Sequence, residues 1–384
     1  MRTALALAAS LALAAPAAAQ DLVFGMSAPF SGAAKELGRS MKVGIDVAFA
    51  AVNDAGGVNG RRVRLAAMDD GYDPGRALAA VKALREKYQV LGYLGNVGSQ
   101  AAADMLPWVL DQRLLVFGTL SGARALRQEP PDRYVFNFRP SYQEETVAAV
   151  KYLVELRRVR PGEIAVFYQD DAFGEAGWDG VAKALRRYRV DPATALRMTY
   201  KRNTADVEEA VKALRQRHGV KAVVMVATYK AAARFIGKVR AAGLDPVFTN
   251  VSPVGSTELA EELRALGPGV ANGVVVTQVV PLPTSSATAI LRYRDALKRY
   301  APDEPPDFLS LEGWVLANLL VEGLKRAGPA PTGEKLVEAL EGLRDLDVGI
   351  GVPLGFGPSE HQASHKLWGT MLDGQGKYHT IDLE

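Results

Sequence analysis

The sequence predicts an α/β protein made of two doubly wound lobes, each with a parallel sheet between layers of helices. Short apolar runs typical of strands alternate with helical patterns along the whole chain. The alternation restarts after Phe138, and 384 residues suffice for two domains of about 150 residues each. Three Pro- or Gly-rich connections, at residues 139–141, 277–283 and 349–357, predict that the chain passes between the lobes three times.

The first run of elements begins with the apolar stretch Leu22–Ser27, which Ser31-Gly32 breaks before a helical pattern starts. The turn at Gly56-Gly57 precedes a segment of alternating apolar and polar residues, and Asp73-Pro74 is typical of a helix entry. We expect strands at 22–27, 62–69, 90–94 and 114–118, and helices at 38–53, 73–87 and 101–111.

The second run repeats the pattern and is followed by three further helices. We expect strands at 163–168, 197–200, 222–227, 247–251, 273–280 and 368–372, and helices at 144–157, 174–188, 206–218, 231–242, 287–300, 309–327 and 332–343. We assign residues 20–140 and 280–347 to one lobe, and residues 141–279 and 348–384 to the other.

The N-terminal residues 1–19 have the pattern of a cleaved signal peptide. Arg2 supplies the positive end, Ala4–Ala14 an apolar run too short for the roughly 20 residues of a membrane span, and Ala17-Ala18-Ala19 the small residues before cleavage. We therefore expect export to the periplasm. The chain has no Cys that could be acylated or form a disulfide, and its net charge of +3 gives no strong electrostatic case for nucleic acid binding.

Small and hydroxyl residues follow the strands of the first lobe, where an α/β sheet places its ligand. Ser99 comes after one strand, and Thr119 and Ser121 come after the next. Free N–H groups at the start of a helix and serine hydroxyls suit a carboxylate. Alternatively, both serines are simply helix N-caps.

Aromatic and polar residues follow the strands of the second lobe, among them Phe173, Tyr229 and Ser252. An aromatic wall with a few polar groups suits a small organic molecule held between two lobes. Alternatively, Phe173 and Tyr229 belong to the hydrophobic core.

With these segments in view, the mature chain resembles the periplasmic amino-acid-binding proteins of the leucine/isoleucine/valine type, which serve ABC transporters. Residues 25–32, 53–60, 69–74 and 168–174 carry the resemblance, and the Asn-x-x-Gly-Gly-x-x-Gly turn followed by the acidic Asp-Pro segment is specific in combination. The resemblance implies a two-lobed "Venus flytrap" fold with three crossovers. It also implies that the ligand meets the following residues: Leu37, Ser99, Thr119, Ser121, Phe173 and Tyr229.

One departure from the family pattern bears on the ligand. Amino-acid binders of this type carry an acid that pairs with the ligand ammonium, and Ser252 stands at the matching position. An unpaired buried ammonium is costly, so either Asp171 or Glu175 substitutes, or the ligand lacks an ammonium. The ligand is then an aromatic or aliphatic carboxylate, or an amide. The family's first-lobe disulfide is absent.

We expect a monomeric solute-binding protein, without cofactor or metal, that passes a carboxylate-bearing ligand to ABC permease subunits. The alternative is a sensory binding protein for aromatic acids or amides that feeds a receptor. A hydrolase is the least favoured class, because residues 118–122 depart from the G-x-S-x-G pattern by one place. His361 and His365 have the i, i+4 spacing of zinc ligands, but Glu360 alone is a weak candidate for the third ligand, so a zinc site is not favoured.

Overall fold

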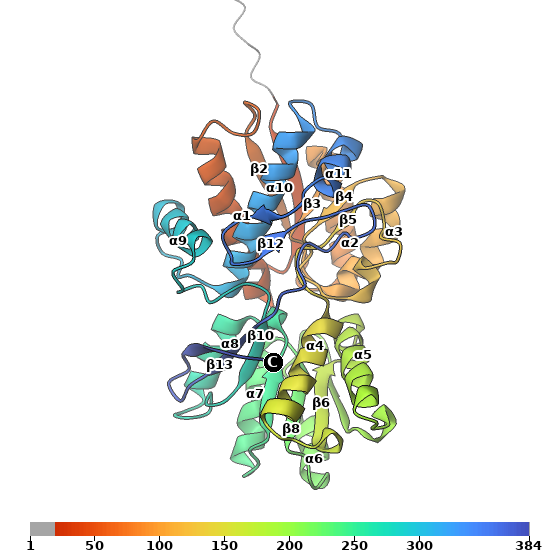
Figure 1. The fold of residues 1–384 in the computed structure, drawn as a ribbon, viewed down its shortest axis with the longest axis vertical. Coiled ribbons are helices and arrows are strands. Elements are labelled where there is room, and N and C mark those ends of the chain that lie inside the picture. Colours follow the sequence, from red (N-terminus) through yellow and green to blue (C-terminus); the bar gives the residue numbers. More distant parts are fainter. Residues whose placement is uncertain (1–19, 384) are drawn as a thin grey trace, which may run out of the picture.

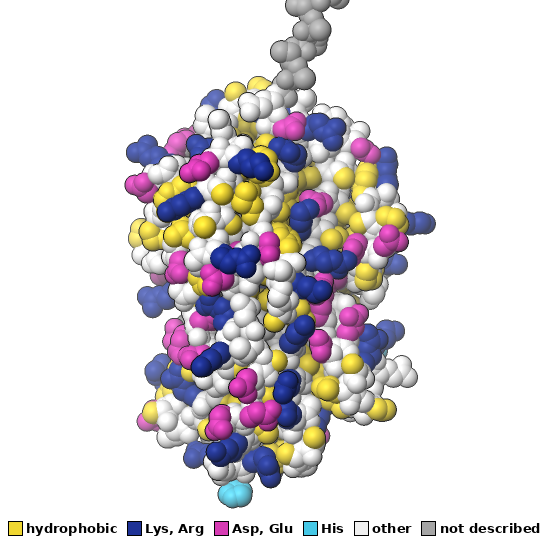
Figure 2. All heavy atoms as spheres, turned by 180° about the vertical axis from the view of Figure 1, so that it is seen from behind, with side chains coloured by type: hydrophobic (Ala, Val, Ile, Leu, Met, Phe, Trp, Pro, Cys, Tyr) yellow, Lys and Arg dark blue, Asp and Glu magenta, His cyan; other side chains and the backbone are white. Residues whose placement is uncertain are grey.

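The computed structural model describes residues 20–383, which form two lobes stacked along the long axis of the molecule (Figure 1). Each lobe has a central sheet with helices on both faces, as the sequence predicts. The predicted signal peptide lies outside the described residues. No helix within residues 20–383 is long and apolar enough to cross a membrane. Basic and acidic side chains are interspersed over the face seen in Figure 2, so that face carries no block of one sign.

The first lobe is built on five parallel strands in the order β2-β1-β3-β4-β5. The strands are β1 (Leu22–Ala28), β2 (Val63–Asp69), β3 (Gly92–Leu94), β4 (Leu115–Phe117) and β5 (Val135–Phe136). The helices between them are α1 (Lys35–Asp54), α2 (Pro74–Tyr88) and α3 (Ser99–Asp111). The predicted entry of α2 is confirmed, because the Asp73 carboxylate accepts the amide of Arg76 at 2.8 Å and Pro74 opens the helix.

The second lobe is built on seven strands in the order β14-β13-β10-β9-β8-β6-β7. Its strands are β6 (Ile164–Gln169), β7 (Arg197–Tyr200), β8 (Ala222–Val226), β9 (Val247–Asn250), β10 (Val275–Gln278), β13 (Trp368–Leu372) and β14 (Tyr378–Ile381). Its helices are α4 (Tyr142–Lys151), α5 (Ala172–Arg187), α6 (Glu208–Gln216), α7 (Tyr229–Ala241) and α8 (Ser256–Ala265). The first five strands in sequence are parallel, whereas β13 and β14 add an antiparallel edge.

Between β10 and β13 the chain returns to the first lobe. It forms α9 (Thr288–Tyr300), α10 (Phe308–Ala327), α11 (Gly333–Glu341) and the small pair β11 (Leu346–Asp347) and β12 (Pro353–Leu354). Helix α10 lies directly against α1 (Figure 1). A Cβ at Gly44 would lie 1.8 Å from the Ser310 carbonyl oxygen, and one at Gly313 would lie 2.3 Å from the Met41 carbonyl oxygen. Glycine at both positions therefore permits this close packing.

The segment after β12 stays on the first lobe longer than the sequence predicts. The Phe356 ring packs edge-on against Phe117 and Phe136, and the His361 ring stacks on Phe136 with centroids 3.9 Å apart. Gln362 forms a β-bridge with Asn137. We propose that the third crossing lies after Ser364, and that the other boundaries are those given above.

A buried ion pair holds the first crossing. Arg139 lies between β5 and α4, and its guanidinium donates two hydrogen bonds to Glu312 of α10, at 2.9 and 2.8 Å. Both side chains are almost fully buried, at 1% and 2% exposure. Burial lowers the pKa of Arg139, but the Glu312 carboxylate outweighs burial and raises it. The crossing is therefore tied to the first lobe by a bidentate charged contact.

Replacing Arg139 by Met should leave the Glu312 carboxylate buried without a partner. We expect a loss of about 3–5 kcal/mol in the free energy of unfolding, measured by urea denaturation. The control is Arg299→Met, which breaks the exposed Arg299–Asp54 pair and should cost less than about 1 kcal/mol. Equal losses of unfolding free energy in the two variants would contradict the claim that the buried Arg139–Glu312 pair holds the first crossing.

Candidate functional site

The carboxyl ends of three parallel strands bring the predicted first-lobe residues together. The Ser27 amide at the end of β1 donates to the Asn96 side chain at 3.1 Å, and the segment after β3 pairs with that after β4 through the Val97–Leu120 bridge. Gly98 has a φ of +109° and is the residue from which α3 begins. This turn directs the start of α3, and with it Ser99, into the space between the lobes.

Two serine hydroxyls form the centre of this arrangement. The Oγ atoms of Ser99 and Ser121 lie 2.8 Å apart, and both residues are buried. Gly98 is the N-cap of α3, and the Ser99 side chain makes no capping bond, so the N-cap alternative is wrong for Ser99. Ser121 Oγ accepts the Ala123 amide at 3.1 Å. The Thr119 Oγ1 atom is buried and has no hydrogen-bond partner within residues 20–383.

Second-lobe aromatics cover these hydroxyls. The Tyr142 hydroxyl is hydrogen-bonded to Ser99, and burial raises the pKa of Tyr142. The Tyr142 and Phe173 rings pack with centroids 5.0 Å apart. Phe173 is held at the start of α5, where its amide donates to the Asp171 carboxylate at 2.9 Å. Phe173 is thus both buried and directed at the interlobe space.

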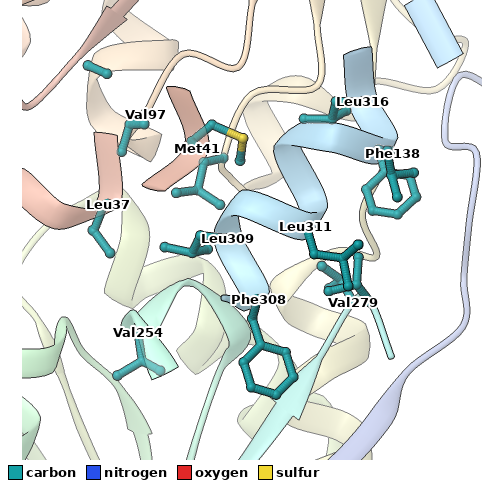
Figure 3. Close-up of a cluster of buried hydrophobic side chains, with 14 of the residues drawn as sticks. Leu37, Met41, Val97, Phe138, Val254, Val279, Phe308, Leu309, Leu311 and Leu316 are labelled. Carbon is teal, nitrogen blue, oxygen red and sulfur yellow. The ribbon is translucent and has the colours of Figure 1, made fainter. Parts of the chain in front are cut away.

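A small cavity remains where the two lobes meet. Its volume is about 10 Å³, roughly what one water molecule needs. Its lining includes the predicted residues Leu37, Ser99 and Phe173, and also Tyr72, Tyr142 and Pro253, which sequence reasoning missed. The sequence feature that could have identified Tyr142 as a site residue is its position directly after the first crossing. Figure 3 shows Leu37 and Val254 reaching from opposite lobes toward the same interlobe space.

The acids that the sequence suggested for a ligand ammonium are engaged elsewhere. The Asp171 carboxylate pairs with Arg202, and that of Glu175 pairs with Arg197 at 2.8 Å. Ser252 does not line the small cavity either. Its amide and hydroxyl donate to the buried Glu145 at 2.7 and 3.0 Å. Burial raises the pKa of Glu145, against the opposing effect of the Arg139 charge.

A wide cleft of about 580 Å³ lies between the lobes beside the small cavity. Tyr229, at the start of α7, lines this wide cleft, together with Glu258 of α8 and Asp307 at the start of α10. Leu37 and Gly255 lie between the two spaces. A Cβ at Gly255 would be 3.1 Å from Leu37 Cδ2 and 3.0 Å from Glu258 Oε2. Tyr229 is therefore buried at the other side of this partition from Phe173.

The acids of the wide cleft are unusually hard to ionise. Burial, reinforced by the nearby Asp307 carboxylate, raises the pKa of Glu258 to about 8. Burial also raises the pKa of Asp307, whose carboxylate accepts the Thr257 hydroxyl at 2.7 Å and the amides of Leu309 and Ser310. Two carboxyl groups from opposite lobes therefore face one space, and desolvation and mutual repulsion disfavour their charged forms.

Direct contacts hold the lobes together on both sides of the cavities. The Asn203 side chain donates to the Gly71 carbonyl at 3.1 Å, and Thr257 of α8 donates to Asp307 of α10. The Phe308 ring packs edge-on against Tyr378 of the second lobe, with centroids 5.5 Å apart. This arrangement is a closed one, in which a molecule between the lobes would touch both.

The two histidines with zinc-ligand spacing serve the third crossing. His361 contacts the Glu341 carboxylate through Nε2 at 3.3 Å, and His365 Nδ1 lies 2.6 Å from Glu144. Burial opposes ionisation of Glu144, yet hydrogen bonds from His365 and Ser141 lower its pKa to about 2. Within residues 20–383, no three His, Cys, Asp or Glu side chains are arranged to hold a metal ion.

Comparison with known proteins gives consistent matches over the whole described chain. A family model described as periplasmic binding protein matches residues 22–377. The chain is similar to the crystal structure of a possible leucine/isoleucine/valine-binding protein from Rhodopirellula baltica, with 36% identity, coverage of 96% of this chain and 98% of that one, and a TM-score of 0.91.

More distant proteins extend this match. The leucine-, isoleucine-, valine-, threonine- and alanine-binding protein of Pseudomonas aeruginosa is 24% identical over 328 residues, which cover 84% of this chain and 83% of that protein. A branched chain amino acid ABC transporter from Thermus thermophilus with bound valine shares the fold. Its TM-score is 0.82 at 19% identity, with coverage of 95% and 96% of the two chains.

Substituting Glu258 by Gln should change how stability depends on pH. The folded protein keeps the Glu258 proton up to about pH 8, whereas the unfolded chain releases it near the ordinary value of 4.5. Wild-type stability should therefore fall relative to the variant as pH rises through this window. We expect the difference in unfolding free energy between variant and wild type to grow by at least about 1.4 kcal/mol between about pH 5 and pH 9.

Urea denaturation at both pH values measures this difference. Glu261→Gln on the same helix is the control, because that side chain is 63% exposed, and its difference from wild type should stay flat. A flat difference for Glu258→Gln as well would contradict the burial of its carboxyl group.

Proposed function

The chain belongs to the periplasmic binding proteins of the leucine/isoleucine/valine type, and from this premise we propose that it captures a small carboxylate-bearing solute for an ABC importer. The observation that carries the proposal is the group of buried hydroxyls at Ser99, Thr119 and Ser121. They lie at the carboxyl ends of β3 and β4, beside the first turn of α3. Hydroxyl donors and free helix N–H groups together suit a carboxylate.

In the proposed mechanism the ligand first meets the open first lobe and the second lobe then closes over it. Ser99, Ser121 and the Thr119 segment bind the carboxylate, and Tyr142 and Phe173 cover it. Leu37 borders the remainder of the ligand, and Tyr229 lines the adjoining wide cleft from the second lobe, whereas Ser252 is engaged with Glu145. The ligand stabilises the closed form because only that form lets both lobes touch it.

The location and partners follow from the family. Members of this family are periplasmic binding proteins, and we propose that residues 1–19 act as the signal peptide that directs this chain to the periplasm. The closed, liganded monomer would dock on permease subunits at the membrane. Its relatives are binding proteins, which favours capture and delivery over catalysis.

Replacing Ser121 by Ala should weaken ligand binding by about 1–3 kcal/mol, because a charged carboxylate loses a hydrogen-bond donor. Isothermal titration calorimetry measures the effect with the solute found in the screen below. Ser364→Ala is a matched control. Its buried Oγ accepts the Lys366 amide at 3.1 Å, as Ser121 accepts that of Ala123, but it has no hydrogen bond to Ser99, which lines the small cavity. Unchanged affinity in Ser121→Ala would remove that residue from the site.

A thermal-shift screen of amino acids, aromatic acids, dicarboxylates and amides should identify the solute class. A ligand at 1,000 times its Kd stabilises the folded protein by about 4 kcal/mol, which raises Tm by several degrees. Because Asp171 and Glu175 are paired with arginines, we expect solutes without an α-ammonium to give the larger shifts. If only α-amino acids raised Tm, the argument drawn from Ser252 would be wrong.

A further inference from the structure

The wide cleft is lined by more carboxyl groups than basic residues. Its carboxyl groups belong to Glu36, Glu258, Glu261, Glu262, Glu304 and Asp307. The basic residues at its rim are Lys35, Arg39 and Lys230. Arg39 is already bonded to Glu304 and Glu36, and Lys35 lies 3.6 Å from Glu36. These pairs leave the deeper carboxyl groups, Glu258 and Asp307, without a cationic partner among the described residues.

Two buried polar atoms at the cleft lack hydrogen-bond partners, and this observation is independent of the number of carboxyl groups there. Tyr229 is only 2% exposed, and its hydroxyl, at the wall of the cleft, has no side-chain partner within residues 20–383, where only the Glu36 backbone approaches it. The Oε2 atom of Glu258 has no hydrogen-bond partner among the same residues. Buried polar atoms in folded proteins are nearly always hydrogen-bonded, so each unpaired atom calls for a partner. Both can accept hydrogen bonds, which points to a donor that enters the cleft.

The geometry narrows the chemistry of that donor. No three acidic or histidine side chains within residues 20–383 converge as a metal site, so a metal ion is not favoured. A volume of about 580 Å³ falls in the range that accommodates a small organic molecule. The lining of the cleft has no residue in common with that of the small cavity, so a cation here is separated from a carboxylate beside Ser99. An α-ammonium, which is attached next to its carboxylate, does not meet this requirement.

We propose that the wide cleft binds the primary ammonium group of an organic cation, held by Glu258 and Asp307 with the Tyr229 hydroxyl as a further acceptor. The inference rests on the proposed function, because it takes the cleft as part of the interlobe solute site. It names an ammonium remote from any carboxylate as a feature of the solute. Glu258 then supplies the acidic partner that Ser252 and its neighbours do not.

The two carboxyl groups also link this binding to closure. Glu258 belongs to α8 of the second lobe and Asp307 to α10 of the first. An ammonium between them attracts both, and it replaces the repulsion of two buried acids by two favourable contacts. Thr257 already joins the helices through its bond to Asp307. The cation therefore stabilises the same closed arrangement that the solute carboxylate favours.

The test compares three probes with the same five-carbon chain: 1,5-diaminopentane, 5-aminopentanoate and glutarate. Calorimetry at neutral pH should show binding of the diamine and the amino acid to wild type. Glu258→Gln should weaken both by at least about tenfold, the scale of a lost charge-assisted hydrogen bond. Glu209→Gln removes the same charge from an exposed position on α6 that lines neither cavity, and should change either affinity by less than about threefold. Tyr229→Phe should weaken both probes by a smaller factor than Glu258→Gln.

Glutarate separates this inference from the proposed function. It should bind Glu258→Gln no more weakly than wild type, because its second carboxylate gains nothing from an acid, and it should lose affinity in Ser121→Ala. Failure of the diamine to bind wild type, or equal losses in Glu258→Gln and Glu209→Gln, would overturn the ammonium site while leaving the carboxylate site intact. Diamine binding that requires Glu258, with no effect of Ser121→Ala on glutarate, would support the ammonium site and overturn the proposed carboxylate site.

Discussion

The buried contact between Arg139 and Glu312 is the interaction on which the relation of the two lobes depends. Arg139 lies in the first crossing, and its charge also acts on Glu145 at the start of the second lobe. Glu145 in turn accepts hydrogen bonds from Ser252 and from Thr277, the latter just before the second crossing. One cation thus organises the exit from one lobe and the return to it. In a medium of low dielectric constant, none of these partners can be removed without leaving another unpaired.

Around this fixed centre, the interlobe space is divided into two chemically different parts. The small cavity is bordered by hydroxyl groups and aromatic rings, which can donate hydrogen bonds to an anion. The wide cleft is bordered by carboxyl groups whose burial resists their ionisation. The linings of the two spaces have no residue in common, and Figure 3 shows Leu37 of the small cavity among the apolar side chains between the lobes. The division gives a single cleft the means to recognise the two ends of one solute by opposite charges.

Much of the fold could be predicted because alternating apolar runs and helical patterns have a direct physical cause in a layered sheet. The antiparallel pairing of β13 with β10 was harder to predict, since partners far apart in sequence leave no local pattern. For the candidate site, the proximity of Ser99 and Ser121 could be predicted because parallel strands end at one edge. Glu258 was missed because an acid on a helix is ordinarily a solvated residue. In the fold it is buried and lies near Asp307, 49 positions later, and both effects raise its pKa.

The close packing of α1 on α10 has a mechanical consequence. Backbone contact at Gly44 and Gly313 leaves no side-chain layer that could shear between the two helices. Their first turns, which carry Leu37 and Asp307, therefore move as one block. Because one wall of each cavity belongs to this block, occupation of either cavity shifts the other toward its bound geometry. By thermodynamic reciprocity, an anion and a cation captured in this protein would each raise the affinity for the other.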